Sequence, residues 1–153
     1  MKLKEKLCFL NLEGCDVLKR KKCVLGFLAV VLFALSSSIA FATAYGIEYF
    51  GTIEFEGHTI PSGQLAHLIE GEGYNIETDG ANFASVGNIC DPSMKFTYGN
   101  GSYELKGDVY WGCSKVGQWK YRLDWDAPRG DACAELWAKN WRVLVAKQCH
   151  YVN

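Results

Sequence analysis

The sequence predicts an all-β fold, a small disulfide-bonded β-sandwich or barrel of about seven to nine short strands, preceded by a signal or transmembrane helix. Three observations support this prediction: alternation of apolar and charged residues at 118–125, glycine-rich breaks between short apolar runs, and four cysteines after residue 44. Apolar residues at helical spacing are nearly absent from the same region. Short strands joined by turns therefore explain the pattern better than helices do.

The first 44 residues contain the three parts of a secretory signal. A cationic lead ending in VLKRKK precedes an apolar core of 13 residues at 23–35, and Ala42 and Ala44 form a small-residue cleavage motif. A membrane-spanning helix needs about 20 apolar residues. We therefore expect residues 1–44 to be a signal peptide cleaved after Ala44 and residues 45–153 to be a secreted domain. The alternative is an uncleaved anchor over residues 23–44 that holds the domain outside the cytoplasm.

The region after residue 44 fits one domain. Its 109 residues, 153 minus 44, carry 9 Lys and Arg against 14 Asp and Glu, a net charge of −5. Nucleic-acid binders and membrane-disrupting peptides depend on a basic surface, so this balance argues against both classes. We expect contact with a membrane only through the signal segment, if that segment is not cleaved.

Early strands are predicted from alternation and from glycine breaks. The segment GTIEFEGHTI alternates apolar and polar residues, which is typical of a half-buried strand. The segments GQLAHLIEGEG and YNIETDGANFASVG read as shorter apolar pieces broken by glycines. A short helix over GQLAHLIEG is the alternative.

The clearest hairpin prediction is SMKFTYGNGSYELKG, in which two alternating runs flank Gly99, Asn100 and Gly101. Such residues adopt the positive φ values that a tight turn needs. Two further strands, DVYWGC and QWKYRLDW, are expected around SKVG.

The chain after residue 132 predicts a last hairpin, with strands on both sides of Lys139 and Asn140. A two-residue turn there would place Cys133 and Cys149 on opposite faces. A disulfide between them would then need a bulge or an odd-length loop, because side chains alternate along a strand.

The cysteines predict two disulfides, because an even number in a small exported domain is typical of cross-linked folds. Three pairings are open, and the sequential one is favoured because each pair brackets a hairpin-like segment. Zinc is the rival interpretation, but no Cys-x-x-Cys pair or paired histidine spacing occurs. We expect no metal or cofactor. The four residues are Cys90, Cys113, Cys133 and Cys149.

The aromatic stripe at 118–125 is predicted to face the core. In a two-layered β-fold one face of each strand fills the interior, so the alternating charged residues should face solvent. An exposed platform for a ligand is the alternative. The stripe consists of Trp119, Tyr121, Leu123 and Trp125.

Other aromatic residues are better candidates for an exposed ligand surface. Tyr110 and Trp111 stand at a predicted strand end, and Trp137 shares a face with Glu135. Exposed Trp and Tyr stack on sugars or anchor protein partners. The alternative for Trp137 is that it covers the stem of Arg142, its neighbour across the two-residue turn.

Signals for catalysis are weak. Nucleophile-elbow, zinc-protease and phosphate-loop patterns do not occur in the sequence, and the acidic residues at 124–131 lack the spacing of a calcium loop. We therefore predict a non-enzymatic extracellular binding protein whose partner is a glycan or another protein. The alternative is a secreted antimicrobial or effector protein that acts on competing cells.

Several segments resemble small exported four-cysteine proteins of actinomycete type. They are ANFASVGNIC, GCSKVGQWK, GDACAELW and QCHYV, with IPSGQLAHLIEGEG upstream. The resemblance includes all four cysteines of the mature chain. It implies a secreted, disulfide-bonded extracellular domain and carries no activity or catalytic residue.

Overall fold

The computed structural model describes residues 42–153, and this part of the chain is all-β, as predicted. Ten strands form three antiparallel sheets, so the predicted number of strands was too low. Within residues 42–153, no helix is long and apolar enough to span a membrane. The predicted signal or transmembrane helix lies outside the described residues.

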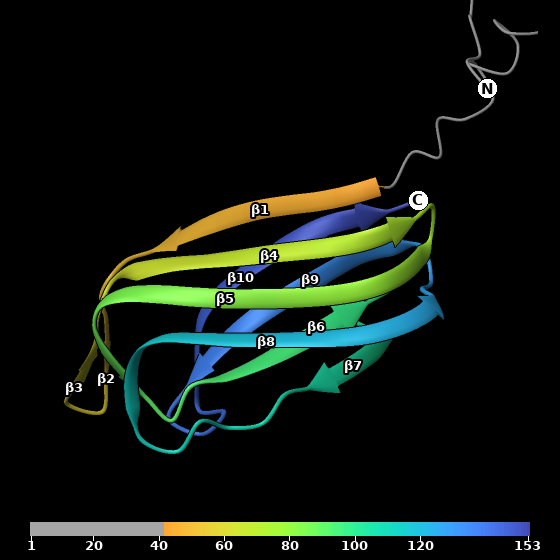
Figure 1. The fold of residues 1–153 in the computed structure, drawn as a ribbon. Coiled ribbons are helices and arrows are strands. Elements are labelled where there is room, and N and C mark those ends of the chain that lie inside the picture. Colours follow the sequence, from red (N-terminus) through yellow and green to blue (C-terminus); the bar gives the residue numbers. More distant parts are fainter. Residues whose placement is uncertain (1–41) are drawn as a thin grey trace, which may run out of the picture. The chain divides into compact units, whose positions relative to one another are not determined.

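Two four-stranded sheets form the layers of the fold, and a small hairpin adds a third sheet (Figure 1). Sheet 1 has the order β1-β4-β5-β8, with β1 at Ala42–Phe50, β4 at Gly63–Glu72, β5 at Asn75–Cys90 and β8 at Cys113–Asp126. Sheet 2 has the order β10-β9-β6-β7, with β10 at Val143–Val152, β9 at Gly130–Ala138, β6 at Ser93–Tyr98 and β7 at Tyr103–Lys106. The hairpin pairs β2 (Ile53–Phe55) with β3 (His58–Ile60).

The apolar core lies between the two large sheets. Leu65 and Phe83 from sheet 1 and Phe96 and Leu136 from sheet 2 are all buried members of one cluster. Burial of such side chains contributes about 2 kcal/mol each. The fold is therefore a sandwich whose stability comes from the inner faces of both sheets.

The aromatic stripe of β8 faces this core, as predicted. Trp119 is buried, and the other three members of the stripe are partly buried against the core cluster. Tyr121 meets the ring of Phe96 edge-on, with 5.7 Å between ring centroids. The platform alternative for this stripe is wrong, because its rings join the two sheets.

Several predicted elements differ from the observed ones. The segment DVYWGC is not a strand, and SKVG lies inside β8 rather than in a turn. Residues 113–116 are in the ladder because Cys113 and Ser114 pair with the end of β5. The segment YNIETDGANFASVG, predicted to be broken by its glycines, lies almost entirely in one strand of 16 residues, β5. The helix alternative for GQLAHLIEG is wrong because that segment is β4.

Both disulfides follow the sequential pairing, Cys90 with Cys113 and Cys133 with Cys149. The first joins β5 to β8 within sheet 1; its cysteines are 23 positions apart in the sequence, and the segment between them includes β6 and β7 of sheet 2. Closing loops of this length stabilises a fold by about 3 kcal/mol in the chain-entropy account. This disulfide therefore restricts the conformations of the unfolded chain over the segment that contains β6 and β7.

The last hairpin has a longer loop than predicted. Residues 139–142 connect Ala138 to Val143, so the two-residue turn is wrong. The predicted bulge is present, between Leu144 and Ala146, and it brings Cys149 opposite Cys133. One extra residue in β10 thus resolves the conflict between strand alternation and the disulfide.

Candidate binding surface

The three aromatic residues predicted to bind a ligand do not form one surface. Tyr110 is half exposed, but its ring packs edge-on against Trp119 at 4.9 Å, and its hydroxyl donates to the carbonyl of Gln118 at 3.1 Å. Tyr110 therefore covers the margin of the core. Trp111 is 77 % exposed beside the Cys90–Cys113 bridge, where the backbone nitrogen of Asp91 donates to the carbonyl of Gly112.

Trp137 projects from β9 on the outer face of sheet 2, where its polar and aromatic groups already have partners. Its Nε1 donates to Glu135 Oε2 at 3.2 Å, and Lys95 Nζ lies 5.4 Å from the centroid of its ring. Its neighbour across the ladder is Leu144 rather than Arg142. The predicted contact with Arg142 is wrong, because the longer loop shifts the register.

We call the surface around Trp137 the lysine–glutamate face. It comprises Lys95, Glu104, Glu135, Trp137 and Lys147. Glu135 binds Lys95 at 2.8 Å and Lys147 at 3.1 Å, and Lys95 also lies 3.5 Å from Glu104. The members of this face are therefore bound mainly to one another.

The two central charges of that face shift each other's titration. Burial, the largest single influence, raises the pKa of Glu135, but the hydrogen bonds and charges of Lys95 and Lys147 together outweigh it and hold the pKa below 4.5. The hydrogen bond from Glu135 likewise raises the pKa of Lys95 above 10.5. Both groups are held in their charged forms, which maintains the ion pair.

The outer face of sheet 1 is different, and its most exposed side chains were not among the predicted site residues. Tyr45, Ile47 and Tyr49 alternate along β1 and are 60 %, 37 % and 73 % exposed. Their period of two is a strand signal that the sequence contains, but it directly follows the predicted cleavage motif. No strand was predicted there, because the stretch was treated only as the start of the mature chain.

Strand pairing places further side chains of sheet 1 on the same face as Tyr45, Ile47 and Tyr49. Partners across an antiparallel ladder point to the same face. Ile47 pairs with Ala66 of β4, which leads to Asn82 of β5 and Gln118 of β8. The next row along β1 contains Tyr49, Gln64, Ala84 and Val116. We call the resulting surface the tyrosine face; it comprises Tyr45, Ile47, Tyr49, Gln64, Asn82, Val116 and Gln118.

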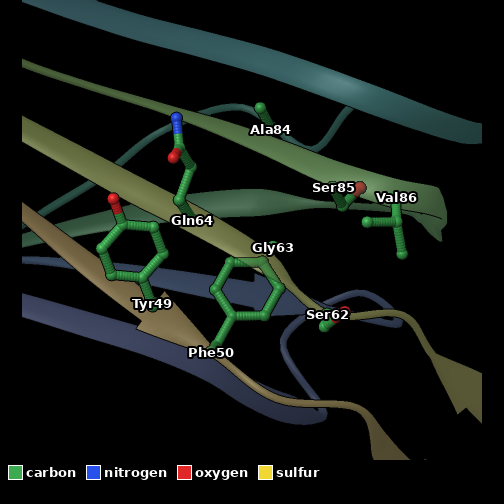
Figure 2. Close-up of a pocket in the computed structure, with 8 residues that line it drawn as sticks. All are labelled: Tyr49, Phe50, Ser62, Gly63, Gln64, Ala84, Ser85 and Val86. Atoms are coloured by element: carbon green, nitrogen blue, oxygen red, sulfur yellow. The ribbon is translucent and has the colours of Figure 1, made fainter.

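An open groove of about 510 Å³ borders the tyrosine face at the ends of β1 and β5. Figure 2 shows the side chains of Tyr49 and Gln64 on neighbouring strands beside this groove. A Cβ at Gly63 would lie 2.3 Å from the carbonyl oxygen of Ala84 and 2.7 Å from the Phe50 ring. A glycine is needed there because β5 and Phe50 approach the β4 backbone closely.

Charged groups gather on the same outer face next to Tyr45, whose row continues through Leu68 and Gly80 to Lys120. Lys120 lies 3.4 Å from Glu70, and Arg122 lies 2.8 Å from Asp124. A hydrogen bond from Thr78 is the main cause that lowers the pKa of Glu70, and Lys120 adds to it. The tyrosine face itself consists of uncharged side chains, so its chemistry is that of rings and amides.

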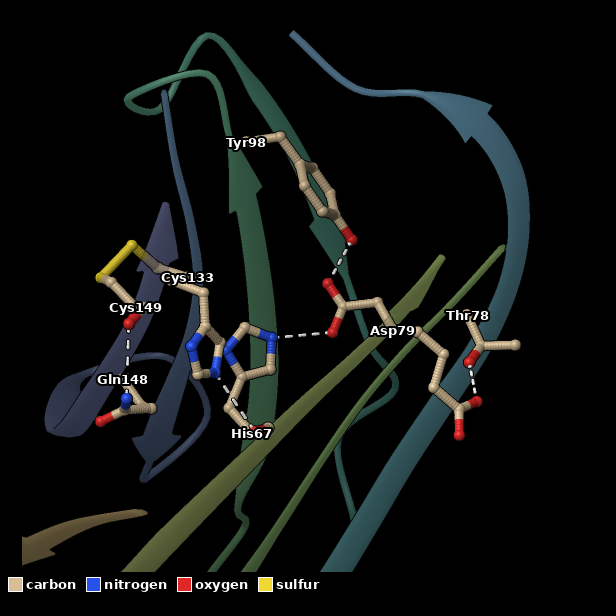
Figure 3. Close-up of polar contacts among 9 residues, drawn as sticks. His67, Thr78, Asp79, Tyr98, Cys133, Gln148 and Cys149 are labelled. Atoms are coloured by element: carbon tan, nitrogen blue, oxygen red, sulfur yellow. Dashed lines mark hydrogen bonds and ion pairs between the residues drawn. A yellow bond between two sulfur atoms is a disulfide. The ribbon is translucent and has the colours of Figure 1, made fainter. Parts of the chain in front are cut away.

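A second polar cluster lies inside the sandwich. The Asp79 carboxylate accepts from Tyr98 at 2.8 Å and lies 2.8 Å from His67 Nε2, while the His150 ring stands 4.9 Å from that of His67 (Figure 3). Burial is the main cause that raises the pKa of Tyr98 and lowers that of His150. His67 and Asp79 have no exposed surface. This cluster joins the two layers from within, and its partly buried member His150 lines a small cavity at the end of the sandwich.

Among residues 42–153, no group of three or more His, Cys, Asp or Glu side chains is arranged to hold a metal ion. The chain matches no protein-family model, and searches of the curated proteins and of the solved structures gave no significant match. The resemblance to exported four-cysteine proteins therefore stays a prediction. The geometry of the two outer faces is therefore the basis of the functional proposal.

Proposed function

We propose that the protein is an exported binding protein and that its tyrosine face holds an uncharged glycan. The observation that carries this proposal is the line of exposed rings on β1, with amide side chains on β4, β5 and β8 in the two rows that start at Ile47 and Tyr49. The two disulfides support a location outside the cytoplasm, where such bonds form and persist.

The rings suit an extended ligand. Tyr45 and Tyr49 are four residues apart on one strand, which places them about 13 Å apart at the usual rise per residue. Ile47 lies between them on the same face. A chain of sugar rings lying along β1 would contact all three side chains and bury their exposed apolar area.

The amides favour a hydroxyl-rich ligand over a protein partner. Gln64, Asn82 and Gln118 each offer both a donor and an acceptor, which matches the dual character of sugar hydroxyls. Protein interfaces usually have an apolar centre and a polar rim. On this face the rings lie on the edge strand β1, and two of the amides, those of Gln64 and Asn82, lie on the central strands β4 and β5.

The test is retention of the exported protein on insoluble polysaccharides and on isolated cell envelopes. We expect the wild-type protein to be retained at low and high salt alike, because the face is uncharged. The double variant Tyr45→Ala, Tyr49→Ala should bind about 100-fold more weakly, since truncation of one exposed aromatic anchor costs about 1–2 kcal/mol.

Two matched controls separate this face from the other exposed rings. Tyr151 is 68 % exposed on β10, and Trp111 lies beside the first disulfide. Tyr151→Ala and Trp111→Ala should leave retention unchanged. Equal loss in Trp111→Ala would transfer binding to an aromatic residue predicted from the sequence, and equal loss in Tyr151→Ala would transfer it to sheet 2. No retention on any glycan, with capture of a protein instead, would refute the proposal.

A further inference from the structure

The groove that borders the tyrosine face has an uncharged and mostly apolar lining. Five of its eight lining residues are Tyr, Phe, Gly, Ala or Val, and the other three are Ser or Gln. Tyr49 belongs both to this lining and to the line of rings on β1, so the groove continues the proposed glycan surface. A ligand group that fits the groove should therefore be uncharged and partly apolar.

Val86 forms the wall of the groove across from Tyr49. Figure 2 shows the Phe50 ring and Gly63 between these two side chains. Val86 is 75 % exposed, so its methyl groups are open to solvent on one side of the groove, as the Tyr49 ring is on the other. A ligand group placed between the two walls would remove this apolar surface from water.

The backbone that carries Val86 is held by its own hydrogen bonds. The pairing of β5 with β8 shifts between Ala84 and Ile89, so Val86 lies in an irregular part of the ladder. The backbone nitrogen of Val86 donates to the carbonyl of Ser62 at 3.0 Å, and Ser85 Oγ donates to the carbonyl of Gly87 at 2.6 Å. Bulges of this kind redirect a side chain, and a wall that is already fixed loses little entropy when a ligand binds.

We propose that this groove holds the N-acetyl group of an amino sugar, so that the glycan bound along the tyrosine face is an N-acetylated one. The acetyl methyl group would contact Val86 and Tyr49, whereas a sugar hydroxyl would leave these apolar walls uncovered. The amide of the same group has one donor and one acceptor, which the Ser62 hydroxyl and the Gln64 amide on the lining match. The inference rests on the proposed function, because the sugar chain must lie along β1 to reach the groove.

The experiment compares retention of the exported protein on chitin and on cellulose. These polymers share one backbone and differ in a single substituent of each ring, which is acetamido in chitin and hydroxyl in cellulose. We expect binding to chitin to be about 10-fold tighter, the usual effect of one small apolar group in a fitted pocket. Equal retention on both would overturn this inference and leave the proposed function intact, whereas retention on no glycan would refute the proposed function itself.

Two matched variants locate the preference in the groove. Val86→Ser should lower retention on chitin to the level on cellulose and leave cellulose binding unchanged, and its Tm should not change because the side chain is exposed. Val116 is 64 % exposed in the row of Tyr49 and Gln64 but does not line the groove, so Val116→Ser should preserve the preference for chitin. Equal loss on both polymers in Val86→Ser, or loss of the preference in Val116→Ser, would show that the groove does not recognise the acetyl group.

Competition in solution supplies a readout that does not depend on a polymer surface. Soluble oligomers of N-acetylglucosamine should release the wild-type protein from chitin at about one tenth of the concentration that glucose oligomers of the same length require. In Val86→Ser the two kinds of oligomer should be equally effective. Equal release of the wild-type protein by both kinds, or better release by the glucose oligomers, would overturn the inference.

Discussion

The two outer faces of the sandwich both contain aromatic and hydrogen-bonding side chains, yet they use them in opposite ways. On the lysine–glutamate face, Glu135 binds two lysines and Trp137, and Lys95 lies over the Trp137 ring. On the tyrosine face, Tyr45 and Tyr49 keep most of their surface exposed. Aromatic content alone therefore does not locate a binding surface; what decides is whether the ring already has neighbours.

Physical chemistry explains why the first face contributes to stability and why the second is free to contribute to binding, as we propose. A nearly buried carboxylate must be paired, since an unpaired buried charge costs several kcal/mol. Exposed rings and amides contribute little to folding, because water can satisfy them in both states. Their free energy becomes available when a ligand displaces that water.

The largest effect is expected from breaking the charge network. In Glu135→Ala, Lys95 and Lys147 lose their shared partner, and Lys95 keeps only 17 % of its side chain exposed. We expect the free energy of unfolding to fall by about 3 kcal/mol, the lower end for a broken buried ion pair because Lys147 is half exposed. Urea unfolding measures this change, and glycan retention of the folded protein should not change.

Glu104 supplies the matched control for this substitution. It also faces Lys95, at 3.5 Å, but nearly half of its side chain is exposed. Glu104→Ala should cost about 0.5 kcal/mol or less, as for exposed ion pairs. If both substitutions had the same small effect, the network would not be structural and the comparison between the faces would fail.

A smaller effect is expected from Gly63→Ala, in the groove that borders the tyrosine face. The added methyl group would press against the Ala84 carbonyl and the Phe50 ring, at distances that no relaxed Cβ contact shows. We expect a loss of about 2 kcal/mol from overpacking, together with weaker retention because the groove beside Tyr49 changes shape. Thermal unfolding and the retention assay measure the two effects on one sample.

Gly80 is the control within the same sheet. A Cβ there meets its nearest atoms, in Lys120 and Trp119, at 3.4 Å, which is ordinary contact. Gly80→Ala should change stability by about 0.5 kcal/mol or less, since a methyl group fits a strand at no steric cost. A large loss at Gly80 would mean that the strand, and not the close approach at Gly63, requires glycine.

Much of the fold can be predicted from local pattern. The alternation at 118–125, the turn at Gly99–Gly101 and the cysteine spacing each depend on neighbouring residues, and each agrees with the structure. The strand prediction failed at 107–112, because the apolar residues of this segment suit a strand although it does not form one. There the backbone nitrogens of Gly107 and Tyr110 donate to Met94 and Pro92 outside any ladder.

The binding surface could not be predicted because it depends on long-range register. Ile47 and Gln118 share a row only because β1, β4, β5 and β8 pair in that order. The neighbour of Trp137 across the ladder depends on the length of the loop at 139–142, and that of Glu135 depends on a bulge in β10 whose position has no local sequence signal. A one-residue difference in such a register changes every neighbour on a face.

Lowering the pH should distinguish the two faces further, because it protonates Glu135 on the lysine–glutamate face. The pKa of Glu135 is held below 4.5 in the folded protein, so its ion pairs stabilise the fold above that pH and are lost as the pH falls. Between about pH 6 and about pH 3, the wild-type protein should therefore lose more unfolding free energy than Glu135→Gln does. Urea titrations of both proteins across this range check the sign. An identical slope would show that Glu135 does not titrate against its lysines.

The smallest effect is expected from Trp137→Phe, the substitution that distinguishes the two faces most directly. Phenylalanine keeps a ring beneath Lys95 but cannot donate to Glu135, so the loss should be about 1 kcal/mol, the value of one hydrogen bond to a charged group partly offset by water. Retention on polysaccharide should not change, because this ring is occupied by Lys95 in the free protein. The same substitution at Tyr49, Tyr49→Phe, removes only a hydroxyl from an exposed ring and should leave stability unchanged while weakening retention a few fold. The opposite outcome, with retention sensitive to Trp137 and insensitive to Tyr49, would require Lys95 to move off the ring when ligand binds. The ion pair with Glu135 opposes that movement, which is why we place the ligand on the other sheet.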